Sequence, residues 1–373
     1  MSNKKLAILG ITAFVMLAWA IVQSKVSNKT NNVSSGSRYL ISGVNADDID
    51  SIVIKSDGKS LTLKRKSNKF FVVNKDNYPA ETEKVNDLIT DCLEIQVTQM
   101  VTDNPANHAD LGVTEDKAQK VITFLKPDGS SLFGIVVGNT REKSQSTYVR
   151  LTSNNKVYEA VQAPYINTEP MDFIKKQLVA IVHNDIQMVS VESPEGKYEL
   201  IPKTDSEDIE MINIPEGKKL KQTEAKNVFN ALSSLDFTDV MKNTGDLTFD
   251  KHYICKLFNT TEFTFNIATK DDKTYVTCKA LFTEGVPKPK PGETTISEEQ
   301  LKEIEEKQKL DTKADDFTSR NMGWVYEISN YKAKYLTMNM SDLLEDAEEI
   351  PASDVSIDPN AVLNKIQEEE PNQ

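Results

Sequence analysis

The sequence is poor in the residues that most often perform catalysis or bind metals. It contains three histidines and three cysteines among 373 residues. His108, His183 and His252 do not fall in an H-E-x-x-H motif, and no two cysteines form a C-x-x-C pair. The G-x-S-x-G, G-x-x-x-x-G-K-[S/T] and G-x-G-x-x-G motifs are missing, as is the D-x-D-x-D-G arrangement of a calcium loop. We therefore predict no catalytic residue, no metal site, no cofactor and no enzymatic activity.

The three cysteines are Cys92, Cys255 and Cys278. In an exported protein Cys255 and Cys278 could form one disulfide, because such bonds persist outside the cytoplasm. Both, however, occupy apolar positions inside expected strands, which favours buried free thiols. The sequence leaves the two alternatives open.

Positive charge is also in short supply. Lys and Arg number 44 against 57 Asp and Glu, which gives a net charge of -13. A nucleic-acid partner is not expected, because binding to phosphates requires a basic face. The one basic cluster is Lys64, Arg65, Lys66 and Lys69. We expect it to be a solvated hairpin tip, with contact to anionic lipid head groups or an acidic envelope polymer as the alternative.

Long apolar runs are absent except at the start, where residues 6–22 carry no charge and follow Lys4 and Lys5. As a helix this run would rise ~25 Å, close to the thickness of a bilayer core. We predict a signal-anchor transmembrane helix at 1–23 and a flexible tether at 24–39 that holds the body off the membrane. The alternative is cleavage after Ala20, which would release a secreted protein.

Beyond the leader, the spacing of apolar residues changes from strand to helix and back. Residues 49–73 alternate apolar and polar side chains around Asp57-Gly58, a hairpin signature. A single apolar stripe follows, made by Val85, Leu88, Ile89, Cys92 and Ile95, which predicts an amphipathic helix. From residue 119 the pattern predicts an antiparallel meander. The segment 171–178, MDFIKKQL, is expected to close this first repeat, residues 40–180, as a short helix.

The second half repeats the same plan. Residues 157–160 read VYEA and residues 325–328 read VYEI. Ile186 lies 137 positions after Ile49, and Val228 lies 140 positions after Leu88. We therefore predict a second repeat at 181–344. The expected fold class is α+β: the N-terminal transmembrane helix, then two tandem repeats, each a β-hairpin, an amphipathic helix and an antiparallel β-meander.

The second repeat contains a charged insertion at 284–316. Ser297 and Gln300 have the spacing of a capping box, which predicts a helix start. That helix has only Leu301, Ile304 and Leu310 as apolar residues, so we expect it to project from the sheet edge. It is either a solvated excursion or a docking arm for a partner. The acidic tail, 345–373, is expected to be disordered.

Four short motifs carry a resemblance to a known family: LGV at 111–113, VGN at 137–139, YVRL at 148–151 and VYEA at 157–160. With the leader and the helix, they resemble the bacterial domain-of-unknown-function family numbered forty-three forty. The likeness covers residues 40–180, with residues 185–345 as a diverged second copy. Phe70-Phe71 stands where the family usually has Trp, and the second copy lacks the LG step.

The resemblance implies a non-catalytic extracytoplasmic protein that accompanies envelope ABC transporters of the gliding-motility auxiliary type. We therefore expect a membrane-anchored accessory subunit of an envelope assembly, with a transporter permease and ATPase as partners. Residues 6–22 would lie in the bacterial cytoplasmic (inner) membrane in a single pass, with the body on the periplasmic side. Contact would involve sheet edges and the arm with Leu301 and Ile304. The alternative is a binding module for an envelope glycan or lipid, using the expected cleft between the two copies near His183 and the aromatic residues Tyr165 and Tyr331.

Overall fold

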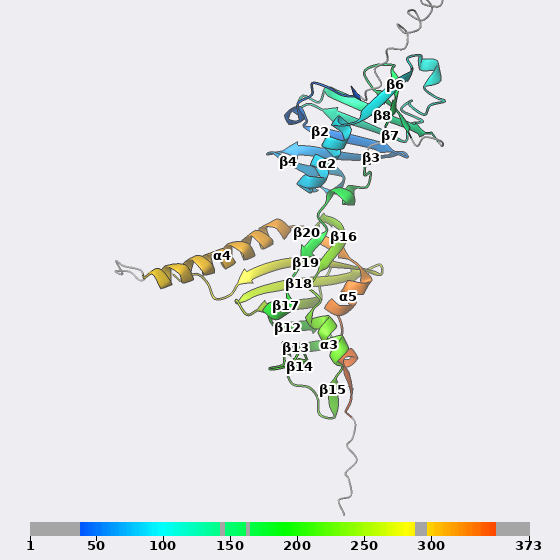
Figure 1. Cartoon of the computed structure of the whole chain (residues 1–373). Coiled ribbons are helices and arrows are strands. Elements are labelled where there is room, and N and C mark those ends of the chain that lie inside the picture. Colours follow the sequence, from blue (N-terminus) through cyan, green and yellow to red (C-terminus); the bar gives the residue numbers. More distant parts are fainter. Residues whose placement is uncertain (1–37, 142–145, 162–164, 288–296, 348–373) are drawn as a thin grey trace, which may run out of the picture. The chain divides into compact units, whose positions relative to one another are not determined.

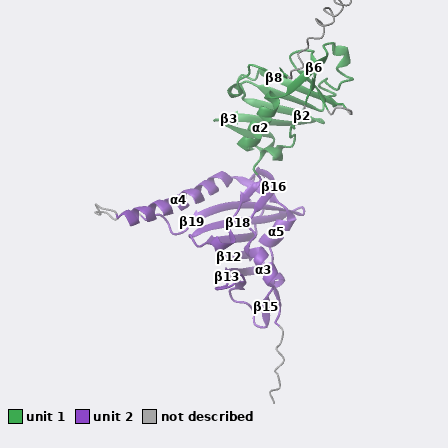
Figure 2. Ribbon diagram, in the orientation of Figure 1, with its two compact units in different colours: residues 1–175 green, residues 176–373 purple. Residues whose placement is uncertain are grey.

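A computed structural model describes residues 38–141, 146–161, 165–287 and 297–347. The chain folds into two compact units, unit 1 (residues 1–175) and unit 2 (residues 176–373), shown in Figure 2. Each unit is built on one large antiparallel sheet (Figure 1).

The sheet of unit 1 has ten strands in the order β1-β6-β10-β9-β8-β7-β2-β3-β4-β5. At the turn between β2 and β3, Asp57 and Gly58 have φ angles of 49° and 74°, the left-handed pair that a two-residue hairpin loop requires. The strands are β1 (Arg38–Tyr39), β2 (Ser51–Ser56), β3 (Lys59–Lys66), β4 (Lys69–Val72), β5 (Tyr78–Pro79), β6 (Gln96–Thr102), β7 (Lys120–Leu125), β8 (Ser131–Thr140), β9 (Thr147–Leu151) and β10 (Val157–Ala160).

The helix α2 (Thr82–Leu93) lies over this sheet (Figure 1). The predicted apolar stripe is confirmed, because Val85, Leu88, Ile89 and Cys92 are all buried on one face of the helix. Burial of each large side chain stabilises the fold by about 1.5–3 kcal/mol, so this face fixes the helix on the sheet.

The sheet of unit 2 has nine strands in the order β11-β16-β20-β19-β18-β17-β12-β13-β14. They are β11 (Gln177–Val179), β12 (Ile186–Ser193), β13 (Gly196–Pro202), β14 (Ile209–Met211), β16 (Leu235–Lys242), β17 (Lys251–Leu257), β18 (Thr261–Lys270), β19 (Lys273–Phe282) and β20 (Trp324–Ile328). The strands β15 (Lys218–Leu220) and β21 (Leu344–Asp346) pair separately. The helices are α3 (Gln222–Phe229), α4 (Glu298–Asn321), α5 (Asn330–Leu336) and α6 (Met340–Leu343).

The two sheets share one strand order. Reading across each sheet, β1-β6-β10-β9-β8-β7-β2-β3-β4 corresponds position for position to β11-β16-β20-β19-β18-β17-β12-β13-β14. The registers agree as well, since Tyr148 pairs with Glu159 in unit 1 and Tyr275 pairs with Glu327 in unit 2. Equivalent residues of the two units can therefore be compared one by one.

The predicted α+β class is wrong. Strands make up 41% of the described residues and helices 24%, and the strands lie in large antiparallel sheets. Long-range pairing is the reason: β2 pairs with β7, and β6 pairs with β10. The hairpin and the meander, which were expected as separate pieces of each repeat, thereby join into one sheet.

An N-terminal transmembrane helix is not supported either. Among the described residues, no helix combines the length and the apolar character that crossing a bilayer requires. The helix predicted at 1–23 lies outside these residues. The tether was predicted at 24–39, but Arg38–Tyr39 form β1. The disordered tail was predicted from residue 345, but Leu344–Asp346 form β21.

The short helix predicted at 171–178 is only partly confirmed, because the helical part ends at Phe173 and the segment closes as a strand. Residues Pro170–Phe173 form a 3₁₀ turn, and Gln177–Val179 form β11, which pairs with β16 of the second sheet. Because β11 pairs with that sheet, the boundary between the units falls at Lys175/Lys176, whereas the sequence placed the end of the first repeat at residue 180.

Cys92, Cys255 and Cys278 are free and buried. Burial raises the pKa of each thiol to about 12. All three therefore stay protonated near neutral pH and act as core side chains.

Candidate functional site

The helix α4 is half packed and half free. Its packed half begins at Ala314, and the Phe317 ring meets the Phe263 ring edge to face at 5.2 Å. The Thr318 hydroxyl donates to the Ala280 carbonyl at 2.8 Å and accepts from the Ala280 amide at 2.9 Å. These contacts fix the C-terminal half of α4 against β18 and β19.

The N-terminal half of α4 extends past the sheet (Figure 1). The predicted capping box is confirmed, because Ser297 and Gln300 exchange their side-chain and backbone hydrogen bonds. Leu301 is 48% exposed and Ile304 is half-buried. Lys307 forms ion pairs with Glu284, which follows β19, and with Glu303 of the same helix, both at 2.7 Å. We call residues 298–306 the α4 arm; its acidic residues are Glu298, Glu299, Glu303, Glu305 and Glu306.

The predicted basic cluster is divided by the structure. Lys64 and Lys66 are exposed on β3, whereas Arg65 is half-buried with its guanidinium 4.9 Å from the centre of the Phe70 ring. Arg65 also donates to the carbonyls of Ala46 and Asp47 at 3.3 Å. It therefore holds the preceding turn in place. The three lysines of the cluster, Lys64, Lys66 and Lys69, are exposed and remain for an external contact.

The histidines are dispersed and each has a structural partner. The Nε2 of His108 lies 2.9 Å from the Asn155 carbonyl, and the Nδ1 of His183 lies 2.8 Å from Oδ1 of Asn230. The Nδ1 of His252 lies 2.9 Å from Oδ1 of Asn266. Within the part of the chain that the structure describes, no three His, Cys, Asp or Glu side chains are grouped to hold a metal ion.

The two aromatic residues of the alternative hypothesis are exposed. Tyr165 is 81% exposed and Tyr331 is 69% exposed. Tyr331 belongs to α5 and meets Tyr335 edge to face, with ring centres 5.4 Å apart. The structure describes the two tyrosines in different units.

The family-like motifs of unit 1 meet in one cluster, which we call the motif cluster. The Asn139 amide donates to the Leu111 carbonyl at 2.9 Å, and Nη2 of Arg150 donates to the Val113 carbonyl at 3.0 Å. Gly138 lies so close to this loop that an added Cβ would be 2.5 Å from the Leu111 oxygen. The motifs thus pack a loop on the sheet and contribute no reactive group.

The shared VYE sequence has one structural role in both units. The Thr98 hydroxyl donates to the carbonyl of Glu159, and the Thr238 hydroxyl donates to the carbonyl of Glu327. Each carboxylate also pairs with a cation, Arg141 at 3.0 Å or Lys273 at 2.9 Å. These contacts join neighbouring strands near irregular pairings of β6 with β10 and β16 with β20.

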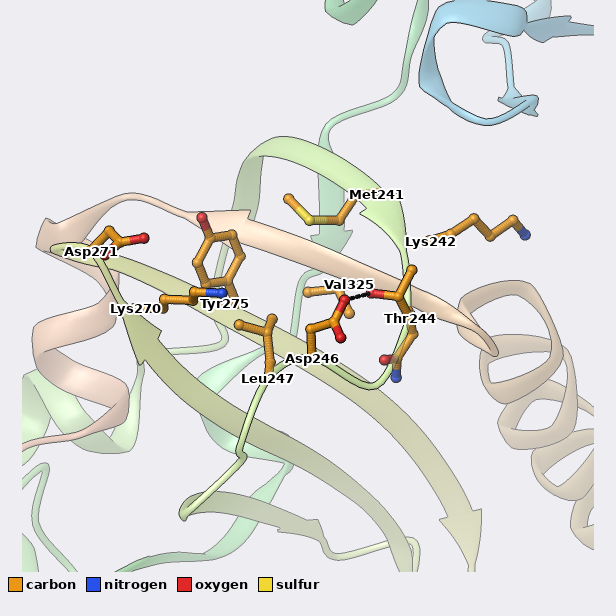
Figure 3. A pocket seen from close by; sticks show the side chains of 10 residues that line it. Met241, Lys242, Thr244, Asp246, Leu247, Lys270, Asp271, Tyr275 and Val325 are labelled. Carbon is orange, nitrogen blue, oxygen red and sulfur yellow. Dashed lines mark hydrogen bonds between the residues drawn. The ribbon is translucent and has the colours of Figure 1, made fainter.

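Sequence reasoning missed a hollow of about 260 Å³ in unit 2. Figure 3 shows Leu247 and Val325 between the Tyr275 ring on one side and Thr244 with Asp246 on the other. Thr244 donates to Asp246 at 2.6 Å, which fixes the turn at the rim. The missing LG step of the second copy was the one signal in the sequence that pointed to this place.

Comparison with known proteins identifies the family alone. No curated protein and no solved structure matches the chain. The family model Domain of unknown function (DUF4340) matches residues 71–254. This single span runs from β4 of unit 1 to β17 of unit 2, whereas the resemblance was expected over each repeat separately. The predicted resemblance to this family is confirmed by the match over residues 71–254.

Proposed function

We propose that the protein is a non-catalytic interaction subunit of a bacterial envelope assembly of the ABC-transporter type, and that the α4 arm contacts the partner. The observation that carries the proposal is the division of α4 into a packed half and an exposed half. A helical segment of about two turns is marginal on its own in water. In this chain it is sustained by the capping box and by continuity with the packed half.

The arm has a chemistry suited to protein contact. Leu301 and Ile304 are three positions apart, so they lie on one face of the helix. The first-turn acids Glu298 and Glu299 favour the helix through its dipole. An apolar pair flanked by acidic residues fits a partner surface that is apolar at its centre and basic at its rim.

The type of assembly and the location rest on sequence. The resemblance implies a transporter permease and ATPase as partners. A basic start followed by the apolar run at 6–22 favours export, so we place the body outside the cytoplasm.

The test is a pull-down of the tagged full-length chain from native membranes in mild detergent, with mass spectrometry of the bound proteins. The wild-type chain is expected to retain a permease and its ATPase. The double variant Leu301→Ala/Ile304→Ala should lose most of both, while circular dichroism stays unchanged.

The matched control is Leu281→Ala, which shortens another exposed apolar side chain of unit 2. It should retain the partners. Equal capture of the partners by the arm variant and the control would rule out the arm as the docking element. If the wild-type chain captures no transporter component, the proposal that it belongs to a transporter assembly is contradicted.

A further inference from the structure

In unit 1 the face of the sheet opposite α2, which we call the outer face, is covered by a segment of the same chain. Val136 and Val157 are buried there together with Val113, and Leu111 packs against them. Tyr148 completes the same cluster. The segment that covers the strands thus places two aliphatic side chains, Leu111 and Val113, on the sheet.

The equivalent place in unit 2 is the hollow. By register, Tyr275 corresponds to Tyr148, because each pairs with the glutamate of a VYE sequence. Val325 begins the second VYE sequence as Val157 begins the first. Tyr275 and Val325 line the hollow together with Met241 and Leu247. The short connection at 243–250 therefore supplies one leucine where unit 1 supplies Leu111 and Val113.

The space that remains is large enough for a side chain. A water molecule has a share of about 30 Å³ in the liquid, so a hollow of about 260 Å³ can hold a branched aliphatic side chain with adjoining backbone. The rim has two lysines and two aspartates, Lys242, Lys270, Asp246 and Asp271. These formal charges cancel, which fits an uncharged occupant.

We propose that this hollow is a docking site for an uncharged loop of a partner protein, which inserts one Val or Leu side chain against Val325 and Tyr275. The occupant enters by its side chain and not by its backbone. Ile267 corresponds to Val137, because they pair with Val276 and Val149 at equivalent places in β19 and β9. Ala268 follows Ile267 as Gly138 follows Val137, and a Cβ added at Gly138 would be 2.5 Å from the Leu111 oxygen. A carbonyl cannot approach unit 2 as closely as Leu111 approaches unit 1.

The occupant is another protein and not a second copy of this chain. The loop that would fit best, residues 108–114, is already in use, because Val113 is fully buried in unit 1. A second copy would have to expose the buried side chain of Val113 to water in order to donate this loop, which is unfavourable for a large apolar side chain.

The experiment titrates a capped peptide with the sequence of residues 108–114 in which Asp110 is replaced by Asn, HANLGVT, so that the probe has no acidic side chain. The peptide is added to the full-length chain labelled at its methionine methyl groups. Met241 lines the hollow and reports binding by NMR, with its signal assigned by Met241→Leu. We expect a saturable shift of the Met241 signal with a Kd on the order of 1 mM, as for a contact worth about 4 kcal/mol. The same peptide with Val113→Asp should bind at least about tenfold more weakly.

Two protein variants make the result specific. Leu247→Trp fills the hollow and should abolish the Met241 shift, whereas Leu281→Trp, at an exposed site on β19, should leave it unchanged. No shift at Met241, an equal shift with the aspartate peptide, or shifts confined to other methionines would overturn the proposal. The variant Leu301→Ala/Ile304→Ala should bind the peptide normally, so this result is independent of the α4 arm.

Discussion

Units 1 and 2 share their strand order but differ in the chemistry of the outer sheet face. In unit 1, Val121 pairs with Val136, and both are buried beneath the motif cluster. In unit 2, the equivalent pair is His252 with Asn266, and Asn266 also donates to Thr277 at 3.2 Å. An apolar, covered face has become a partly exposed polar face on the same backbone.

The core face has not diverged in this way. Val85, Leu88 and Ile89 of α2 correspond to Ala225, Val228 and Phe229 of α3, and all six are buried. A helix stripe tolerates changes of size but not of polarity, because a buried polar group without a partner costs several kcal/mol. The outer face could change once its covering loop was shortened. The comparison teaches that the covering loop, and not the strand order, decides what each unit presents to solvent.

The sharpest test of this difference exchanges glycine and alanine at the equivalent positions. Gly138→Ala should lower the free energy of unfolding of unit 1 by about 3 kcal/mol, because the new Cβ would be 2.5 Å from the Leu111 oxygen and 2.6 Å from Cγ1 of Val113. Ala268→Gly in unit 2 should cost only about 1 kcal/mol. Urea unfolding followed by circular dichroism measures both.

Tryptophan fluorescence separates the units in the same experiment. Trp324, in β20, is the only tryptophan outside the leader. Gly138→Ala should therefore leave the Trp324 transition in place while an earlier transition appears in circular dichroism. Equal costs for the two exchanges would refute the claim that the loop approaches one unit more closely.

The next largest effect concerns Arg150, which joins the covering loop to the sheet. Its Nε and Nη2 donate to the Val113 carbonyl, and its Nη1 donates to the carbonyls of Leu151 and Asn154 at 3.1 Å. Arg150→Met keeps the apolar stem and removes these hydrogen bonds, so we expect a loss of about 2 kcal/mol in urea unfolding. Thr277→Ala, at the equivalent position of unit 2, should cost about 1 kcal/mol or less. A larger loss for Thr277 would reverse the comparison.

A smaller effect, which depends on pH, separates the two VYE glutamates. Glu159 accepts hydrogen bonds from Ser146, Gln99 and Arg141, and the bond from Ser146 contributes most to holding its pKa below the usual value. Because the folded pKa is depressed, the stabilisation is complete above the pKa of the unfolded chain and is lost as the pH falls through the folded pKa. Glu159→Gln should cost about 1 kcal/mol near neutral pH.

The gap between wild type and Glu159→Gln should close as the pH is lowered, which thermal unfolding at a series of pH values will show. Glu327→Gln is the matched control and should cost less, because Lys273, its ionic partner, is mostly exposed. A gap for Glu159 that does not change with pH would mean that the charge of its carboxylate contributes nothing.

Local features of this fold were predictable from the sequence, whereas the pairing of its strands into two large sheets was not. The hairpin turn at Asp57-Gly58, the stripe around Leu88 and the cap at Ser297 depend on residues a few positions apart, and all three are present. The pairing of Ile52 with Phe124 joins residues far apart in the chain, and no local period encodes it. This missing information made the α+β class wrong.

The same limit explains the errors at smaller scale. In MDFIKKQL the apolar residues fit either a helix or a strand, and the pairing of Gln177 with Asp236 decides for a strand. The hollow was not predicted, because it arises where the segment that covers the sheet is short. The spacing of apolar residues along the sequence predicts helices and strands, and it does not show where a covering side chain is missing. The place of Leu301 and Ile304 near the start of a helix, by contrast, was predictable, because the capping box at Ser297 is a local signal.

The smallest expected effect compares the two halves of α4. Leu301→Ala and Ile304→Ala should each change the free energy of unfolding by less than about 0.5 kcal/mol, as expected for side chains that make little contact with the body. Ser297→Ala should cost about 1 kcal/mol, because it removes the cap that begins the helix. Urea unfolding followed by Trp324 fluorescence measures all three. A loss of more than about 1 kcal/mol for Leu301 would mean that the arm packs on its own unit. Partner capture by the arm variant would then report a damaged fold, and the division of α4 into a packed half and a free half would no longer hold.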